Sequence, residues 1–96
     1  MEKEKIQKKI EVNLPLLRQK YKVKRIGIFG SYVRNEQKRG SDVDVLVEFR
    51  TPVGFFEFIR LENYLSRILN KKVDLISRKA IKKAIKSDII KEVKYV

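Results

Sequence analysis

The stretch that decides the fold is residues 26–48, with the sequence IGIFGSYVRNEQKRGSDVDVLVE. Two largely apolar runs, residues 25–29 and 43–47, flank a polar insert. Short apolar runs of this kind are typical of buried β-strands. The first run stops at Gly30-Ser31, and the residues after it predict a short helix over 32–36. The stretch therefore predicts two strands joined by a tight turn, a short helix and a polar loop.

Two carboxylates accompany the second apolar run. Side chains alternate between the two faces of a strand, so Asp42 and Asp44 are expected to point the same way, about 7 Å apart. An ionised carboxylate within a strand of Val and Leu is costly unless it is paired or binds a metal. Mg²⁺ is the metal that this pattern favours, because one or two carboxylates and the phosphates of a substrate commonly hold it.

Gly30-Ser31 supplies the other half of the predicted site. A strand that ends at glycine and turns into a helix leaves free backbone N–H groups at the helix start, where phosphate binds readily. Gly30 permits close approach and unusual backbone angles, and Ser31 offers a hydroxyl to a phosphate oxygen. We therefore expect a phosphate-binding turn beside the metal-binding carboxylates.

The spacing of these motifs resembles that of a known superfamily. Gly30-Ser31, ten residues and then Asp42-Val43-Asp44 are similar to the GS…DxD signature of the DNA polymerase beta nucleotidyltransferases. The fuller pattern resembles the smallest branch, the minimal nucleotidyltransferase (MNT) domains, which include the antitoxins of HEPN/MNT toxin–antitoxin pairs. The resemblance covers residues 6–96. Two positions depart from the family's usual GSxARG, because Val33 replaces Ala and Asn35 replaces Gly.

The resemblance implies an activity, a substrate and a partner. It implies transfer of AMP from ATP to a tyrosine of a HEPN toxin, at a site with two Mg²⁺ ions. Asp42 and Asp44 would hold the metal on the triphosphate. A third acidic residue on a neighbouring strand would bind metal as well and would deprotonate the acceptor hydroxyl, and Asp74 is the matching position.

The residues around Asp74 support this assignment and leave an alternative open. Asp74 interrupts the apolar run within residues 71–77, as Asp44 interrupts its own. Glu48 shares the face of Asp44, but it lies four residues further along the strand, too far to reach the same ion. The alternative is that Asp74 lies on an edge strand and pairs with Lys72.

The composition limits the possible chemistry and location. The chain contains no cysteine and no histidine, so carboxylates must perform any acid–base chemistry. Its net charge is +12, contributed by residues 1–25 and 71–96, while residues 26–70 are neutral. This charge attracts nucleic acid, ATP or an acidic protein, although solvated helix faces explain it more simply. No apolar run could span a membrane and no signal-peptide core follows the start, so we expect a cytoplasmic protein.

The periodicity of the chain predicts one small α+β domain over residues 1–96. We expect a small mixed sheet of three or four strands, with strands at residues 23–29, 42–49 and 71–77. Helices that cover this sheet are expected at residues 2–21, 55–69, 79–86 and 87–96. In the resembling family this arrangement is the nucleotidyltransferase fold.

Local signals refine this expectation. A proline predicts a break near residues 12–14, with Asn13 as the cap of the second helical piece. Gly27 is expected to let a helix pack closely on its strand. Phe55 and Phe56 are assigned to the core face of their helix, and Ser87 is assigned as a helix N-cap.

Three cationic side chains near the predicted turn need an assignment. Lys38 and Arg39 could reach a triphosphate from the polar loop, but exposed loop charges are the simpler interpretation. Arg34 follows the turn by one helical turn and is assigned a structural role, paired with Glu36 or with a site carboxylate.

Two other functions stay open. A binding-only antitoxin would keep the fold and the partner without turnover, and Val33 and Asn35 leave room for it. A basic nucleic-acid-binding domain would bind DNA or RNA with a steep salt dependence, but no aromatic residue is interleaved with the basic runs. The oligomeric state is not set by the sequence, so a homo-oligomer is also open.

Overall fold

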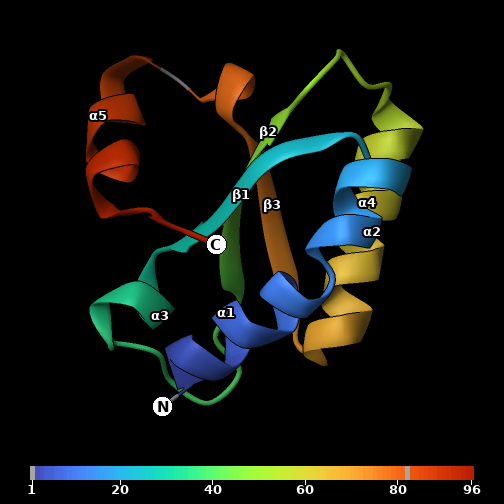
Figure 1. Ribbon diagram of the computed structural model, residues 1–96. Coiled ribbons are helices and arrows are strands. Elements are labelled where there is room, and N and C mark those ends of the chain that lie inside the picture. Colours follow the sequence, from blue (N-terminus) through green and yellow to red (C-terminus); the bar gives the residue numbers. More distant parts are fainter. Residues whose placement is uncertain (1, 82) are drawn as a thin grey trace.

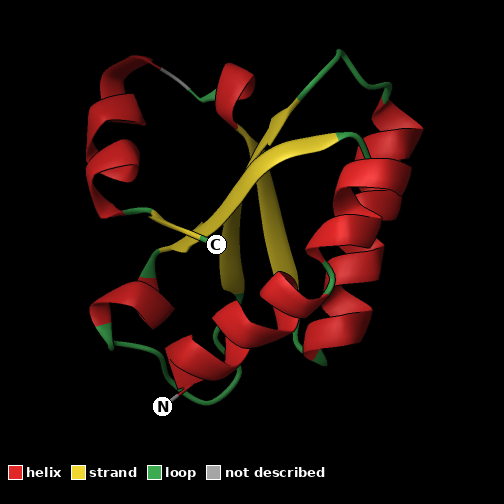
Figure 2. Cartoon of the chain, in the orientation of Figure 1, coloured by secondary structure: helices red, strands yellow, loops and turns green. Residues whose placement is uncertain are grey.

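The computed structural model describes residues 2–81 and 83–96, and its centre is a four-stranded sheet in the order β3-β2-β1-β4 (Figure 1). Helices lie on both sides of this sheet (Figure 2). The elements in chain order are α1 (Glu2–Val12), α2 (Leu14–Lys20), β1 (Val23–Phe29), α3 (Ser31–Arg34), β2 (Val43–Phe49), α4 (Phe55–Leu69), β3 (Val73–Ser77), the 3₁₀-helix η1 (Arg78–Ala80), α5 (Lys83–Glu92) and β4 (Lys94–Tyr95).

The sheet combines antiparallel and parallel pairs. β1 runs antiparallel to both β2 and β4, whereas β2 runs parallel to β3. A parallel pair needs a crossover connection, and α4 provides it. The α+β class and the mixed sheet are therefore as predicted.

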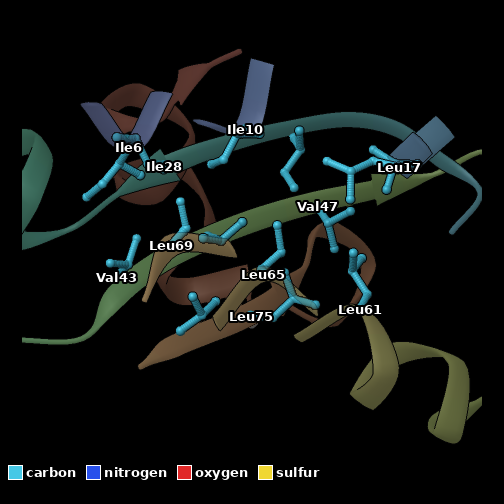
Figure 3. Packing of buried hydrophobic residues seen from close by; sticks show 14 of the residues in the cluster. Ile6, Ile10, Leu17, Ile28, Val43, Val47, Leu61, Leu65, Leu69 and Leu75 are labelled. Carbon is cyan, nitrogen blue, oxygen red and sulfur yellow. The ribbon is translucent and has the colours of Figure 1, made fainter. Parts of the chain in front are cut away.

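The main hydrophobic core lies between one face of the sheet and helices α1, α2 and α4 (Figure 3). Alternation along β2 places Val43, Val45 and Val47 on this face, each with 0% exposure. The helices contribute apolar side chains at helical spacing, namely Ile6, Ile10, Leu17, Leu61, Leu65 and Leu69. Of the helices in the described ranges, none is long and apolar enough to cross a membrane.

The opposite face of the sheet has a smaller core. Phe29 and Leu46 are buried there and pack with Val93, which follows α5. Because side chains alternate along β2, Asp44 shares this face with Leu46. The predicted site therefore lies at the border of the smaller core, on the side of the sheet away from α4.

The break between α1 and α2 falls at Asn13, as predicted, but its side chain does not cap α2. The amide nitrogen of Asn13 donates to the carbonyl oxygen of Lys9, and its Oδ1 accepts a hydrogen bond from the Tyr64 hydroxyl at 2.8 Å. The side chain thus joins the end of α1 to α4, which is a tertiary contact that local sequence does not reveal.

The assignment of Phe55 and Phe56 to the core is wrong. Their side chains are 71% and 73% exposed, and they pack on each other at a ring separation of 5.6 Å. Both belong to the first turn of α4. The core face of the helix begins one turn later, with Phe58 half-buried and Leu61 fully buried.

The C-terminal assignments need correction, except for Lys82, which lies outside the described residues. Ser87 is inside α5 and caps nothing, because a single helix runs through it. The chain then leaves the helix at Val93, and β4 pairs with β1, with Gly27 opposite Tyr95. A two-residue strand is too short to show a period, so the sequence pattern does not distinguish it from a continuation of the preceding helix.

The close approach at Gly27 involves a strand and not a helix. A Cβ at this position would lie 2.7 Å from the carbonyl oxygen of Lys94 and 2.9 Å from the Cα of Tyr95. Glycine therefore allows β4 to pair at this point of β1, and the smaller core closes beneath the pair.

Candidate active site

Two parallel strands bring the predicted carboxylates together. Asp44 on β2 lies directly opposite Asp74 on β3. Strands in a sheet are about 4.8 Å apart, and opposed residues project to the same face. Asp42 precedes Asp44 by two residues, just before the start of β2 at Val43. The structure thus places all three carboxylates at the corner of the sheet where β2 and β3 begin.

Gly30 lies against this group of carboxylates. Its backbone has φ 81° and ψ −153°, a conformation that is open to glycine and strained for other residues. A Cβ on Gly30 would lie only 2.0 Å from Oδ2 of Asp44. Ser31 then begins α3, so the predicted turn and the predicted metal-binding strand are in direct contact.

Asp44 is the most perturbed of the three carboxylates. Burial first of all, and then the neighbouring charges of Asp74, Asp42 and Glu92, raise its pKa to about 6, although the charge of Arg34 acts to lower it. Lys72, the alternative partner for Asp74, instead lies 4.0 Å from Asp42. The start of β2 and β3 therefore carries a concentrated negative charge that the cationic side chains of the chain neutralise only in part.

These carboxylates fit a hard divalent cation whose other ligands come from a substrate. Within residues 2–81 and 83–96, no three His, Cys, Asp or Glu side chains approach closely enough to enclose an ion. Mg²⁺ usually keeps several waters or phosphate oxygens and needs only one or two carboxylates. Asp44 and Asp74 are adjacent oxygen donors that repel each other, so a cation between them would relieve the strain of that repulsion.

Arg34 is held beside the carboxylates by two acidic residues. Its guanidinium donates to Glu36, as expected, and also to Glu92 at 2.6 Å from the end of α5. These hydrogen bonds raise the pKa of Arg34. Sequence reasoning missed Glu92, because nothing in the chain links it to a residue 58 positions earlier.

Glu48 does not belong to the carboxylate group. It lies at the other end of β2, where its oxygens are 3.1 Å from Arg25, 3.9 Å from Lys24 and 4.0 Å from Arg78. The sequence argument that rejected Glu48 for its distance along the strand is thus consistent with the structure.

The two departures from the family motif are structurally mild. Asn35 has φ 59°, the left-handed conformation for which glycine is best suited and which asparagine tolerates well. Val33 is half-buried and packs against the main core. In the loop that follows, Ser41 Oγ accepts a hydrogen bond from the backbone N–H of Lys38. Lys38 and Arg39 have exposed side chains.

Comparison with known sequences identifies the family. The sequence model of the nucleotidyltransferase domain matches residues 4–96. A protein adenylyltransferase, MntA of Thermococcus cleftensis, is 45% identical over 80 residues, which are 83% of this chain and 81% of that protein. The chain therefore belongs to the nucleotidyltransferase domain family, and it is a nucleotidyltransferase.

Solved structures agree with this conclusion. A protein described provisionally as a minimal nucleotidyltransferase superposes with a TM-score of 0.83 at 26% identity, covering 98% of this chain and 95% of that one. A crystal structure of a toxin–antitoxin with AMP-PNP contains a chain with a TM-score of 0.76 at 27% identity, covering 93% of this chain and 70% of that one. The fold is that of the minimal nucleotidyltransferases.

The raised pKa of Asp44 leads to a prediction about stability in the absence of metal. The folded pKa of about 6 lies above the unfolded value of about 3.9, so the folded protein holds the proton more tightly. Stability should fall as pH rises from about 4 to about 6 and stay lower above that range. In EDTA, Asp44→Asn should therefore stabilise the protein by about 1 kcal/mol at pH 7.5, a value discounted for partial exposure, and by nothing at pH 4.

Urea unfolding at the two pH values measures this difference. Asp88→Asn is the control, because Asp88 is an exposed carboxylate on α5. An equal effect of Asp44→Asn on the free energy of unfolding at both pH values would contradict the raised pKa of Asp44.

Proposed function

We propose that this protein transfers AMP from ATP to a hydroxyl group of a partner protein, as the antitoxin of a HEPN toxin. The observation that carries the proposal is the opposition of Asp44 and Asp74 beside Gly30. Adjacent carboxylates at a glycine turn suit a nucleotide whose phosphates arrive with Mg²⁺. A relative at 45% identity is named a protein adenylyltransferase, and a structural relative is an assembly of toxin and antitoxin with AMP-PNP.

Each site residue has a distinct role in the proposed reaction. Asp42 and Asp44 hold Mg²⁺, with Asp74 as a further ligand where a second ion is bound. Gly30-Ser31 places backbone N–H groups and a hydroxyl against the triphosphate. Mg²⁺ supplies charge neutralisation at the phosphates and the leaving group. Asp74 orients the acceptor hydroxyl and accepts its proton as the new O–P bond forms and the bond to pyrophosphate breaks.

The shape of the site favours a protein as the acceptor. The carboxylates lie where β2 and β3 begin, whereas a cavity lined by Phe49 and Ser77 lies beyond the other end of these strands. Nearly the whole chain is used for the sheet and its covering helices, so few residues remain to hold a large acceptor. A folded partner brings its own contacts and completes the site. ATP and such a partner both imply a cytoplasmic location.

A binding-only antitoxin is the main alternative. Such a protein would have no use for a carboxylate that burial and like charges keep at a raised pKa. Asn35 adopts a left-handed conformation that glycine would also adopt readily, so its presence does not favour inactivity.

Transfer of radiolabel tests the proposal directly. The purified chain is incubated with Mg²⁺ and the protein encoded by the neighbouring gene, and the ATP is labelled on either the α- or the γ-phosphate. We expect label on the partner only from α-labelled ATP, no transfer in EDTA, and a mass increase of one AMP group on a tyrosine. Label from γ-labelled ATP would indicate a kinase, and an unlabelled partner in both experiments would favour the binding-only function.

A further inference from the structure

A second surface feature lies at the far end of the sheet from the carboxylates. An open cavity of about 690 Å³ lies where β2 and β3 end, between the start of α4 and the 3₁₀-helix η1. We call it the distal pocket. Leu75, Ile76 and Phe58 contribute apolar lining, and Phe55 stands at its edge with 71% of its surface exposed. The proposed reaction uses none of these residues.

The distal pocket is apolar with a cationic margin. Arg78 and Lys79 line it, together with one carboxylate, Glu48. Glu48 is already neutralised by Arg25, Lys24 and Arg78, so the pocket as a whole presents positive charge. Lys79 is exposed at this margin, so its ammonium is free to meet a carboxylate of an incoming partner.

The charge of the chain selects among possible occupants. A second copy would bring another +12 charge against this cationic margin, so self-association here is opposed by repulsion. A nucleic acid would place phosphates against Leu75 and Ile76, which offer them no hydrogen bonds. A protein segment with an apolar side chain for the pocket and carboxylates for its margin satisfies both features.

We infer that the distal pocket is the docking site for the acceptor protein, through an acidic segment that inserts an apolar side chain beside Phe55. This inference rests on the proposed function, because it assumes a protein acceptor. Asp44 and Phe49 lie five residues apart on β2, so the pocket lies about 17 Å from the carboxylates. A folded domain spans that distance easily, and its acceptor hydroxyl reaches the carboxylates while the acidic segment is held at the pocket.

The separation of docking from chemistry makes the inference testable by kinetics. Phe55→Ala and Lys79→Glu change the pocket margin without touching the carboxylates or Gly30. With ATP saturating and the neighbouring gene's product as acceptor, each should raise the KM for the acceptor about tenfold and leave kcat within about twofold. The effect of Lys79→Glu should shrink as salt is raised, because it acts through charge.

Val12→Ala and Lys5→Glu are the matched controls, since they remove an exposed apolar group and reverse an exposed charge on α1. An unchanged KM in both pocket variants would overturn the inference. So would the finding that these variants abolish RNA binding or self-association while acceptor binding is normal. If wild type transfers no AMP, the proposed function fails alone, and titration of the acceptor with the same variants still tests docking.

Discussion

Asp44→Asn will reduce AMP transfer by about a thousandfold or more and will leave the fold intact. Asp44 neighbours Asp42 along the strand and Asp74 on the next strand, so it is the central member of the three carboxylates. Asparagine keeps the size of the side chain but loses the charge that would bind Mg²⁺ in the proposed reaction. With Mg²⁺ present, the variant should also bind ATP more weakly than wild type does. In EDTA, the variant and wild type should bind ATP equally weakly.

Asp74→Asn should separate nucleotide binding from chemistry. If Asp74 mainly orients and deprotonates the acceptor, the variant should bind ATP with Mg²⁺ nearly as wild type does but transfer AMP at least about a hundredfold more slowly. Calorimetric titration with a non-hydrolysable ATP analogue measures the first quantity, and single-turnover transfer of α-label measures the second. Asp88→Asn is the control, because Asp88 is an exposed carboxylate on α5, away from the carboxylate group and from the distal pocket. Equal transfer by the Asp44 variant and wild type would exclude the assigned site.

The grouping of the three candidate carboxylates was partly predictable from sequence, through strand periodicity for Asp42 and Asp44 and through the family resemblance for Asp74. Alternation along β2 placed Asp42 and Asp44 on one face, and the interrupted apolar run at Asp74 marked the adjoining strand. The parallel register that sets Asp44 opposite Asp74 was not implied by any local pattern. It depends on the length of α4 and of its connections, so it is a property of the assembled fold.

The features that sequence reasoning missed all depend on where an element ends. Phe55 and Phe56 continue the apolar pattern of α4, but both lie in its exposed first turn, before the helix begins to contribute to the core at Phe58 and Leu61. β4 is only two residues long, and its place was set by the room above Gly27. Glu92 reaches Arg34 only because α5 ends there. Periodicity gives the type of an element more reliably than its extent.

Gly30→Ala will damage both the stability and the activity of the protein. At φ 81° and ψ −153°, any side chain strains the backbone, which costs about 1–3 kcal/mol. The new Cβ would also meet Oδ2 of Asp44 at 2.0 Å and its Cγ at 2.9 Å. Either α3 or the carboxylate must move. We expect a total loss of about 2–4 kcal/mol in the free energy of unfolding and a loss of AMP transfer of at least about a hundredfold.

Gly40→Ala is a control for the loss of stability that a side chain causes at a positive φ. Gly40 has φ 86°, close to that of Gly30, but a Cβ there would meet nothing within 4 Å. It should cost only the strain of a positive φ, about 1–2 kcal/mol, and should leave transfer unchanged. The cost of the contact with Asp44 is then measured by adding Gly30→Ala to an Asp44→Ala protein, which lacks Oδ2 and Cγ, the two atoms closest to the new Cβ. In that background Gly30→Ala should destabilise the protein by less than it does in the wild type, and a full additive loss would show that Gly30 is required for its backbone conformation alone.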